Sequence, residues 1–446
     1  MGKNWVNLHS HTTFSMLDGH GTTENYAKRA KELQMGSLAI TDHGNIHGWI
    51  DHYQACKDHD IKPILGLEAY QARKTRLDRD EEERAGPAKN EWEQRGPYHL
   101  SVIAQNKEGY NNLMKLSSRA FLEGYYVKPR LDLELLSEHS KGIILLSGCL
   151  GGAVQQALLR GDFDAALKHA STMQDIVGKE NYFIEIQDHG LVEQKQVKED
   201  TLKIAKLIGA KVVATGDCHY VLKEDHQAHD FMLCAGTKAT IFDENRFKFE
   251  GPEFYLHSYE EMLTRFEPKW LQNTCDVADM VDVDIKFGDF HFPSFPDVPK
   301  DMTPDTLLEE QAWKGLKERY GDPLPDEVVI RAKHELGVVK RMGFQEYFLV
   351  VGDLVRWAKD NGIRVGFGRG SAAGSILSYA LKITNLDPIR FGLIFERFLV
   401  EGRKTMPDID LDFDDRYRER VIQYARDKYG EDHVAQICNF FTVGAK

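Results

Sequence analysis

Histidine, carboxylate and thiol side chains follow a series of short apolar segments in the first 220 residues. "NLHSHTTFSMLDG" carries two histidines and an aspartate, and "TDHG" and "GLEAY" each place one such residue directly after an apolar run. Imidazole, carboxylate and thiolate together suit Zn²⁺, Mn²⁺ or Fe²⁺ better than Mg²⁺. The candidate metal ligands are His9, His11, Asp18, His43, Glu68, His99, Cys149, Asp217 and His219.

Each of these residues also has an ordinary structural interpretation. A single histidine after a strand is more often a hydrogen-bonded packing residue, and Cys149 alone would be a small buried hydrophobe. Recurrence favours the metal interpretation, because independent structural histidines have no reason to follow so many apolar segments. The set therefore predicts a site shared by two or three ions.

A glycine-rich segment, "GFGRGSAAGS" at residues 366–375, forms a second candidate site. Glycines let the backbone approach a ligand closely, and the amides that begin the following helix favour an anion such as a triphosphate. The spacing differs from that of the P-loop, so an ATPase or GTPase is disfavoured. Taken alone, the segment is compatible with simple turn chemistry.

Further along the chain, "TMPDIDLDF" places Asp408, Asp410 and Asp412 at alternate positions. In a β-strand they would share one face, each about 6.8 Å from the next. Two neighbours could hold a pair of ions about 4 Å apart, whereas the outer two lie too far apart to share it. The alternative is the solvated acidic face of an edge strand.

Alternating apolar runs and amphipathic stretches in the first 220 residues predict parallel β/α units closed into a barrel, with functional groups at the carboxyl ends of the strands. The charged stretch 77–96 is interpreted as a solvated loop insertion. From about residue 255 the pattern changes to longer helices. One is expected from the Thr303–Pro304 cap to about Arg319, another from near Pro325, and a third ending at Gly362.

Length and composition limit the class of protein. A chain of 446 residues, 42% of them hydrophobic, favours two substantial domains. No apolar run is long enough to cross a bilayer and no signal peptide is recognisable, so a cytoplasmic protein is expected. Six cysteines without a CxxC pair do not suggest a disulfide framework. The net charge of −13 argues against a generally basic nucleic-acid-binding surface, although a local groove or metal ions could still hold a phosphate backbone.

The motifs H-x-H, S-x-L-D-G, T-D-H-G, G-x-E, Y-H-L, S-G-C and G-D-x-H, in this order, resemble the PHP domain that begins bacterial replicative polymerases. The resemblance implies a seven-stranded β/α barrel in which the nine residues named above hold up to three Zn²⁺ or Mn²⁺ ions. It also implies metal-dependent phosphoester hydrolysis, with 3′–5′ removal of nucleotides from a primer as the proofreading form.

The segments "MGFQEYFLVVGDLVRWAKDNGI", "GFGRGSAAGS", "KITNLDPIRFGLIFERFL" and "MPDIDLDF" are similar to the C-family replicative DNA polymerases. The resemblance implies a PHP domain at residues 1–270 and, at 271–446, part of an α+β palm like that of polymerase beta. Gly370 and Ser371 then fall on the turn that holds the incoming dNTP, with Arg369 as a phosphate contact. Asp408 and Asp410 fall on the catalytic pair that binds Mg²⁺, and Asp412 on a position that is no principal ligand.

In that family a third catalytic aspartate lies beyond a thumb insertion, and the sequence stops at Lys446 before it. The expectation is that this chain alone does not extend primers. The expected partners are a DNA primer-template, a C-terminal polymerase half and replisome subunits, with no membrane partner. Two alternatives stay open: a self-standing PHP phosphoesterase that acts on small phosphates and keeps a degenerate palm, and a non-catalytic assembly half.

Overall fold

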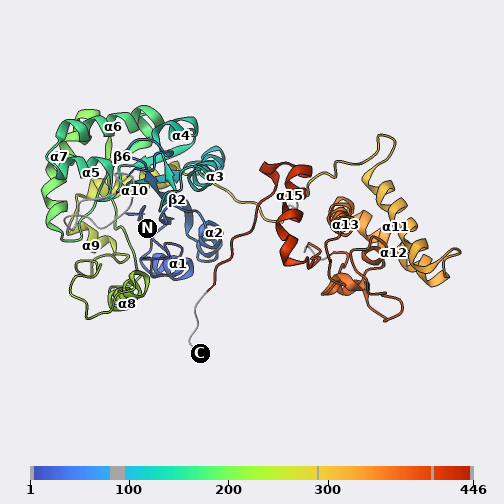
Figure 1. Ribbon diagram of the computed structural model, residues 1–446. Coiled ribbons are helices and arrows are strands. Elements are labelled where there is room, and N and C mark those ends of the chain that lie inside the picture. The colour runs from blue at the N-terminus through green and yellow to red at the C-terminus, as the bar shows by residue number, and fades with distance from the viewer. Residues whose placement is uncertain (1–4, 81–95, 289–290, 403–405, 442–446) are drawn as a thin grey trace. The chain divides into compact units, whose positions relative to one another are not determined.

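The chain divides into two units, Met1–Ile285 and Lys286–Lys446. The computed structural model describes residues 5–80, 96–288, 291–402 and 406–441 (Figure 1). Most of the loop insertion expected at 77–96 therefore lies outside the described residues. Among those described, no helix has the length and apolar character needed to span a membrane.

A curled seven-stranded sheet forms the centre of the first unit, in the order β1-β2-β3-β5-β6-β7, with β4 paired to β2. All neighbouring strands are parallel except β3, which runs antiparallel to β2 and β5. The strands are β1 (Ser37–Ile40), β2 (Lys62–Gln71), β3 (Tyr98–Ala104), β4 (Arg130–Leu131), β5 (Ile143–Leu146), β6 (Tyr182–Ile186) and β7 (Lys211–Ala214).

The α/β barrel prediction is confirmed, but the prediction that all its strands are parallel is wrong for β3. Residues 72–80, 96 and 97, which are the described part of the connection between β2 and β3, contain no helix. An antiparallel neighbour needs no helical crossover, whereas a parallel one does. Periodicity alone does not reveal strand direction, so the sequence pattern of β3 was equally compatible with both.

An extended segment near the N-terminus joins the two edges of the sheet. Ala39 and Thr41 donate backbone hydrogen bonds to Asn7 O and Ser10 O, at 3.1 and 2.8 Å. On the other side, the amide of Cys218 donates to His9 O at 3.1 Å, after the end of β7. The segment thus closes the sheet into a barrel and carries two of the candidate ligands within its wall.

Helices cover the outside of the barrel, and one of them, α10, packs against the side chains in its interior. Cys275, Val277 and Ala278 of α10 pack among the inward-facing strand side chains, including Ile64 and Phe183. The boundary expected after residue 270 falls inside α10, and this packing is why the first unit extends to Ile285. The helices are α1 (Thr23–Glu32), α2 (Trp49–Asp58), α3 (Lys107–Leu122), α4 (Leu133–Glu138), α5 (Ala153–Leu159), α6 (Phe163–Val177), α7 (Val192–Ile208), α8 (His226–Thr237), α9 (Tyr259–Leu263) and α10 (Pro268–Met280).

The second unit is built on helices around a core that includes Leu308, Phe344, Phe348 and Phe395. The helix starts at the Thr303 cap and after Pro325 are confirmed, as is the end before Gly362, where Asn361 is the C-cap. The helices are α11 (Pro304–Tyr320), α12 (Asp326–Met342), α13 (Gln345–Asp360), α14 (Ile376–Ala380) and α15 (Arg418–Tyr429).

The acidic segment 408–412 was predicted to be a strand, and this is wrong over its whole length. In the described residues of the second unit the only β pairing is an isolated antiparallel bridge between Val365 and Phe413. Before that bridge, the amide of Ile409 donates to the Tyr347 hydroxyl at 3.1 Å, so a side chain takes the place of a neighbouring strand.

Candidate metal centre

The nine candidate ligands meet at one end of the barrel. His43 follows β1, Glu68 lies in the second half of β2, and Asp217 and His219 follow β7. His99 lies at the start of β3, but because β3 is antiparallel this start pairs with Tyr70, near the end of β2. The single reversed strand therefore still delivers its ligand to the shared edge.

Glu68 is the centre of one group of contacts. Its Oε1 lies 3.3 Å from His9 Nε2, 3.0 Å from His99 Nδ1 and 3.3 Å from Cys149 Sγ. Its Oε2 lies 2.6 Å from His43 Nδ1. Because this carboxylate is almost fully buried, its position among three imidazoles is fixed by the fold.

Asp217 and Asp18 provide the other carboxylates. Asp217 Oδ1 lies 3.2 Å from His11 Nε2 and 3.4 Å from His9 Nε2. Asp18 Oδ2 lies 3.3 Å from His43 Nε2. The two histidines of the H-x-H motif thus face the same carboxylate.

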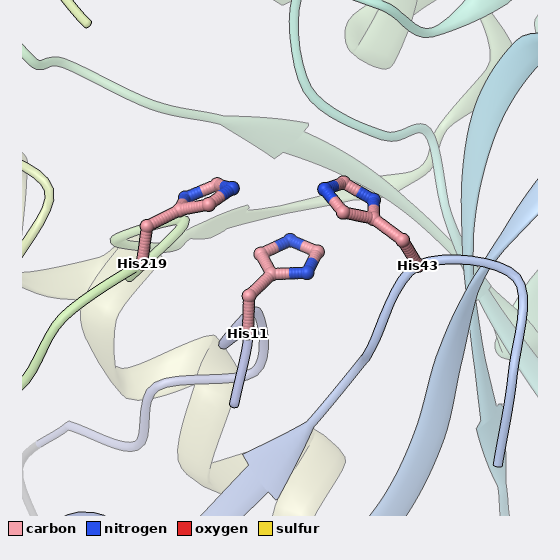
Figure 2. A group of neighbouring side chains, drawn as sticks. All are labelled: His11, His43 and His219. Carbon is pink, nitrogen blue, oxygen red and sulfur yellow. The ribbon is translucent and has the colours of Figure 1, made fainter. Parts of the chain in front are cut away.

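The imidazole rings themselves lie close together, as Figure 2 shows for His11, His43 and His219. The centroid of His11 is 4.1 Å from that of His43 and 4.3 Å from that of His219. Three sets of side chains bring their ligand atoms within 4.8 Å of one another: His11, His43 and His219; His9, His11 and Glu68; and His43, Glu68 and His99. Shared members make this a polynuclear arrangement rather than separate sites.

Several buried polar atoms of this cluster face one another as close ion pairs but without the geometry of a hydrogen bond. A buried polar atom without a hydrogen bond costs about 1–3 kcal/mol. Metal coordination would use these lone pairs, so the cluster fits metal ions, and its nitrogen, oxygen and sulfur donors fit Zn²⁺ or Mn²⁺. The atoms are His9 Nε2, His11 Nε2, Asp18 Oδ1, His43 Nδ1, Glu68 Oε2 and Asp217 Oδ1.

The electrostatic environment differs between the histidines. Burial lowers the pKa of His219 to about 3, with a further lowering from His11. Burial also opposes the charged form of His43, but Asp18 and Glu68 together raise its pKa to about 10. Metal binding therefore has to displace a proton from His43, whereas His219 is already the neutral ligand that a metal requires.

Glu185, the fourth of the five residues of β6, is a residue of this cluster that the sequence analysis missed. Its Oε1 lies 2.7 Å from His9 Nδ1 and accepts a hydrogen bond from the Thr215 hydroxyl at 2.5 Å. Its Oε2 accepts from Ser101 and from the Gly148 amide, at 3.2 and 3.1 Å. The available signal was a lone charge inside the buried apolar run "YFIEIQ".

Asp42 and Ser15 were missed in the same way. The Ser15 hydroxyl donates to Asp42 Oδ1 at 2.8 Å and lies 3.1 Å from His11 Nδ1. Asp42 also accepts from the amide and hydroxyl of Thr12. These contacts hold the loop that follows His11 and orient its ring.

The glycine-rich and acidic segments of the second unit lie against each other. Arg369 Nη1 lies 2.9 Å from Asp410 Oδ1, and its Nε lies 3.0 Å from Asp412 Oδ2. A Cβ on Gly370, which has a φ of +68°, would stand 2.8 Å from Asp410 Oδ2. The turn therefore requires glycine both for its backbone angle and for this close approach.

Asp408 lies on the same extended segment and is exposed, as is Ser371 on the turn. Between the acidic residues, Ile409 and Leu411 pack against the hydrophobic core. The apolar and acidic residues therefore separate to opposite sides of the segment.

The helix start after the glycine-rich turn was expected to favour an external anion, and this is wrong for α14. The amides of Ile376 and Leu377 donate to the Glu335 carboxylate at 3.1 and 3.2 Å, and the Ser375 hydroxyl donates to it at 2.8 Å. Because Glu335 is fully buried, this carboxylate of the chain already occupies the anion position.

Two protein families match this sequence. Residues 7–189 match the PHP domain, and residues 306–446 match the bacterial DNA polymerase III alpha NTPase domain. Two solved structures, of a proposed metal-dependent phosphoesterase from Bifidobacterium adolescentis and an amidohydrolase from Chromobacterium violaceum, align at 16% and 12% identity with a TM-score of 0.29 each. They cover 48% and 59% of this chain and 87% and 98% of their own, and a likeness at that score carries no weight.

Curated relatives align with nearly the whole chain. The DNA polymerase III subunits alpha of Thermus aquaticus, Saccharopolyspora erythraea and Treponema pallidum are 40%, 44% and 42% identical, each over 99% of this chain. The chain spans 41%, 38% and 37% of the lengths of those three proteins.

Proposed function

We propose that the first unit is a metal-dependent phosphodiesterase that removes nucleotides from DNA 3′ ends. This proposal is for a chain whose residues 7–189 match the PHP domain and whose residues 306–446 match the bacterial DNA polymerase III alpha NTPase domain. The proposed ions are Zn²⁺ or Mn²⁺, up to three of them. The proposed setting is DNA replication in the cytoplasm, with a primer-template, replisome subunits and a C-terminal polymerase half as partners.

The observation that carries this proposal is the convergence of the nine candidate ligands, six of which place a buried polar atom in the cluster without hydrogen-bond geometry. Metal ions in such a site lower the pKa of water and neutralise charge on a leaving oxygen, so no protein nucleophile is needed. The chain itself binds and orients these ions. Glu185 holds the His9 ring, and Ser15 with Asp42 holds the His11 ring.

A primer-shortening assay tests the proposal. A 5′-labelled primer annealed to a template is incubated with the full chain and with Mg²⁺, Mn²⁺ or Zn²⁺ in separate reactions. We expect shortening with Mn²⁺ or Zn²⁺, lost in His9→Ala and His11→Ala and kept in His139→Ala, a histidine outside the cluster. Shortening that survives both ligand substitutions, or no shortening with any ion, would contradict it.

For the second unit, we propose part of a nucleotidyl-transfer site of DNA polymerase type. The supporting observation is the contact between Arg369 and the acidic segment, which brings the two predicted parts of such a site together. Asp408 and Asp410 would hold Mg²⁺, and Arg369, Gly370 and Ser371 would contact the triphosphate of a dNTP. The ions would supply charge neutralisation for the phosphates.

Binding of a fluorescent dNTP in the presence of Mg²⁺ tests this second proposal. Asp408→Asn and Asp410→Asn should weaken binding about tenfold or more, since each removes a charged ligand of the ion. Asp360→Asn is the control, because Asp360 is exposed at the end of α13, outside the acidic segment and the glycine-rich turn, and it should change binding much less. Equal effects of all three substitutions would contradict the assignment.

A further inference from the structure

Exposed aromatic rings lie in a row beside the metal centre. Phe121 is the next-to-last residue of α3 and Tyr125 lies in the turn that follows, and they are 40% and 55% exposed. Their ring centroids are 6.3 Å apart and their planes are nearly parallel, at 17°. The exposed His47, four residues after the ligand His43, places its ring 6.3 Å from that of Phe121.

Three residues after Tyr125, the cation Lys128 contacts a ring that neighbours the ligands. The Lys128 ammonium lies 5.0 Å from the centroid of the Tyr70 ring. The same ring lies 6.1 Å from the His43 ring and 5.3 Å from the His99 ring. These two histidines retain 15% and 16% side-chain exposure, whereas those of His9 and His11 retain none, so the cation lies on the open side of the centre.

The segment that carries these groups is held rigidly. Arg130 is fully buried, and its guanidinium donates to the backbone carbonyls of Gly124 and Asp78 at 3.0 and 2.7 Å. Val127 has a φ of +65°, a costly conformation for an exposed β-branched residue, and the flanking Tyr126 amide donates to Lys128 O at 3.0 Å. Strained backbone of this kind clusters at binding sites, and here it directly precedes Lys128.

We propose that Phe121, Tyr125 and Lys128 form a shelf that binds the unpaired end of a DNA strand on its way to the metal centre. Exposed rings stack on the face of any base, and an ammonium contacts the backbone phosphate, which together suit single-stranded DNA without sequence preference. Bases within a duplex are already stacked on one another. The shelf therefore selects a frayed or single-stranded 3′ end over a duplex end or a small phosphate ester.

This inference rests on the proposed phosphodiesterase function but can be tested separately, by binding. The full chain, in chelator to prevent hydrolysis, is titrated into a fluorescein-labelled oligothymidylate and into a duplex of equal length. Phe121→Ala/Tyr125→Ala should weaken single-strand binding about tenfold, the usual cost of losing stacked bases. Lys128→Ala should weaken it severalfold, and Lys128→Glu more.

The controls for binding lie at the other end of the barrel. Leu207→Ala and Lys206→Ala remove an exposed apolar group and an exposed cation at the end of α7, just before β7 begins. They should leave the affinity unchanged. Unchanged affinity in the shelf variants, with unchanged thermal unfolding, would overturn the inference, as would tighter binding of the duplex than of the single strand.

Hydrolysis rates on two substrates distinguish the contribution of the shelf from that of the metal centre. With Mn²⁺, the rate of shortening of a single-stranded oligonucleotide is compared with hydrolysis of thymidine 5′-(p-nitrophenyl phosphate), which is too short to reach both rings. The shelf variants should lose about tenfold more kcat/KM on the oligonucleotide than on the ester. Equal losses on both substrates would overturn the inference. If the unsubstituted chain hydrolyses neither, the phosphodiesterase proposal fails, and the binding titration alone decides whether the shelf holds DNA.

Discussion

His9 Nδ1 lies 2.7 Å from Glu185 Oε1, and this contact turns the opposite ring nitrogen toward Glu68 and Asp217. The carboxylate fixes both the tautomer and the ring orientation, as carboxylates behind metal-bound histidines commonly do. Burial alone would lower the pKa of His9, but Glu185 and Asp217 outweigh it and raise that pKa well above its usual value.

Loss of this carboxylate should weaken metal binding. We expect Glu185→Ala to lower the affinity for Mn²⁺ or Zn²⁺ about 10- to 100-fold, the usual effect of removing a partner of a metal ligand. Glu185→Gln, which keeps an oxygen that can accept from His9, should lose less. Isothermal titration of the chelator-treated chain measures both. Exposed Glu180→Gln is the control, and an affinity in Glu185→Ala equal to that of the control would contradict the role of Glu185.

Removal of Mn²⁺ or Zn²⁺ should destabilise the first unit and spare the second. A ligand at a hundred times its dissociation constant stabilises the folded state by about 2.7 kcal/mol. The buried nitrogen and oxygen atoms that would bind Mn²⁺ or Zn²⁺ all lie in the first unit. Calorimetry with and without chelator should therefore show that the unfolding temperature of the first unit falls and that of the second unit stays constant. In His11→Ala, the unfolding temperature of the first unit should depend much less on metal. A shift of both transitions by the same amount would contradict a single metal centre in the barrel.

The meeting of the nine candidate ligands could be predicted from sequence because most of them are metal-competent residues that follow an apolar run. Glu185 could not, because a single charge in a strand does not reveal whether it faces solvent or a buried histidine. Closure of the barrel by the segment containing His9 was also hidden, because its pairing partners near Ala39 and Cys218 are remote in sequence.

In the second unit the sequence located the glycine-rich turn and the acidic segment, and the structure places Arg369 between Asp410 and Asp412. The group that accepts hydrogen bonds from the first amides of α14 could not be predicted. Glu335 lies in an amphipathic helix with many other charges, and nothing in the spacing indicates that its carboxylate turns inward to the amides of α14.

Acid should destabilise the first unit through His52. Burial lowers the pKa of His52 to about 4, and its Nε2 lies 3.0 Å from the Leu38 carbonyl. The unfolded chain, with an ordinary pKa near 6.5, binds the proton first, so the stabilisation is complete above about pH 6.5 and is lost as the pH falls toward 4. The free energy of unfolding lost over this pH range is about 3 kcal/mol.

His52→Gln isolates this effect from other titrating groups. In urea unfolding of the first unit, the free energy lost by the substitution should be largest near pH 7.5 and should shrink steadily down to pH 4.5. A difference between the two proteins that stays constant over this range would show that His52 does not titrate as its burial requires.

Glu335 should be a main support of the second unit, because it is the only acceptor shown for two amides at the start of α14. Its carboxylate is buried, which raises its pKa, and it also lies 2.7 Å from Arg331 Nε. Glu335→Ala leaves these donors without that acceptor and should cost about 3 kcal/mol in urea unfolding of this unit, whereas Glu335→Gln, which keeps one oxygen, should cost about half. Lys333→Ala, exposed on the same helix, should cost almost nothing. If Glu335→Ala were as stable as the Lys333 variant, the helix start would be open, and an external phosphate would again be the expected occupant.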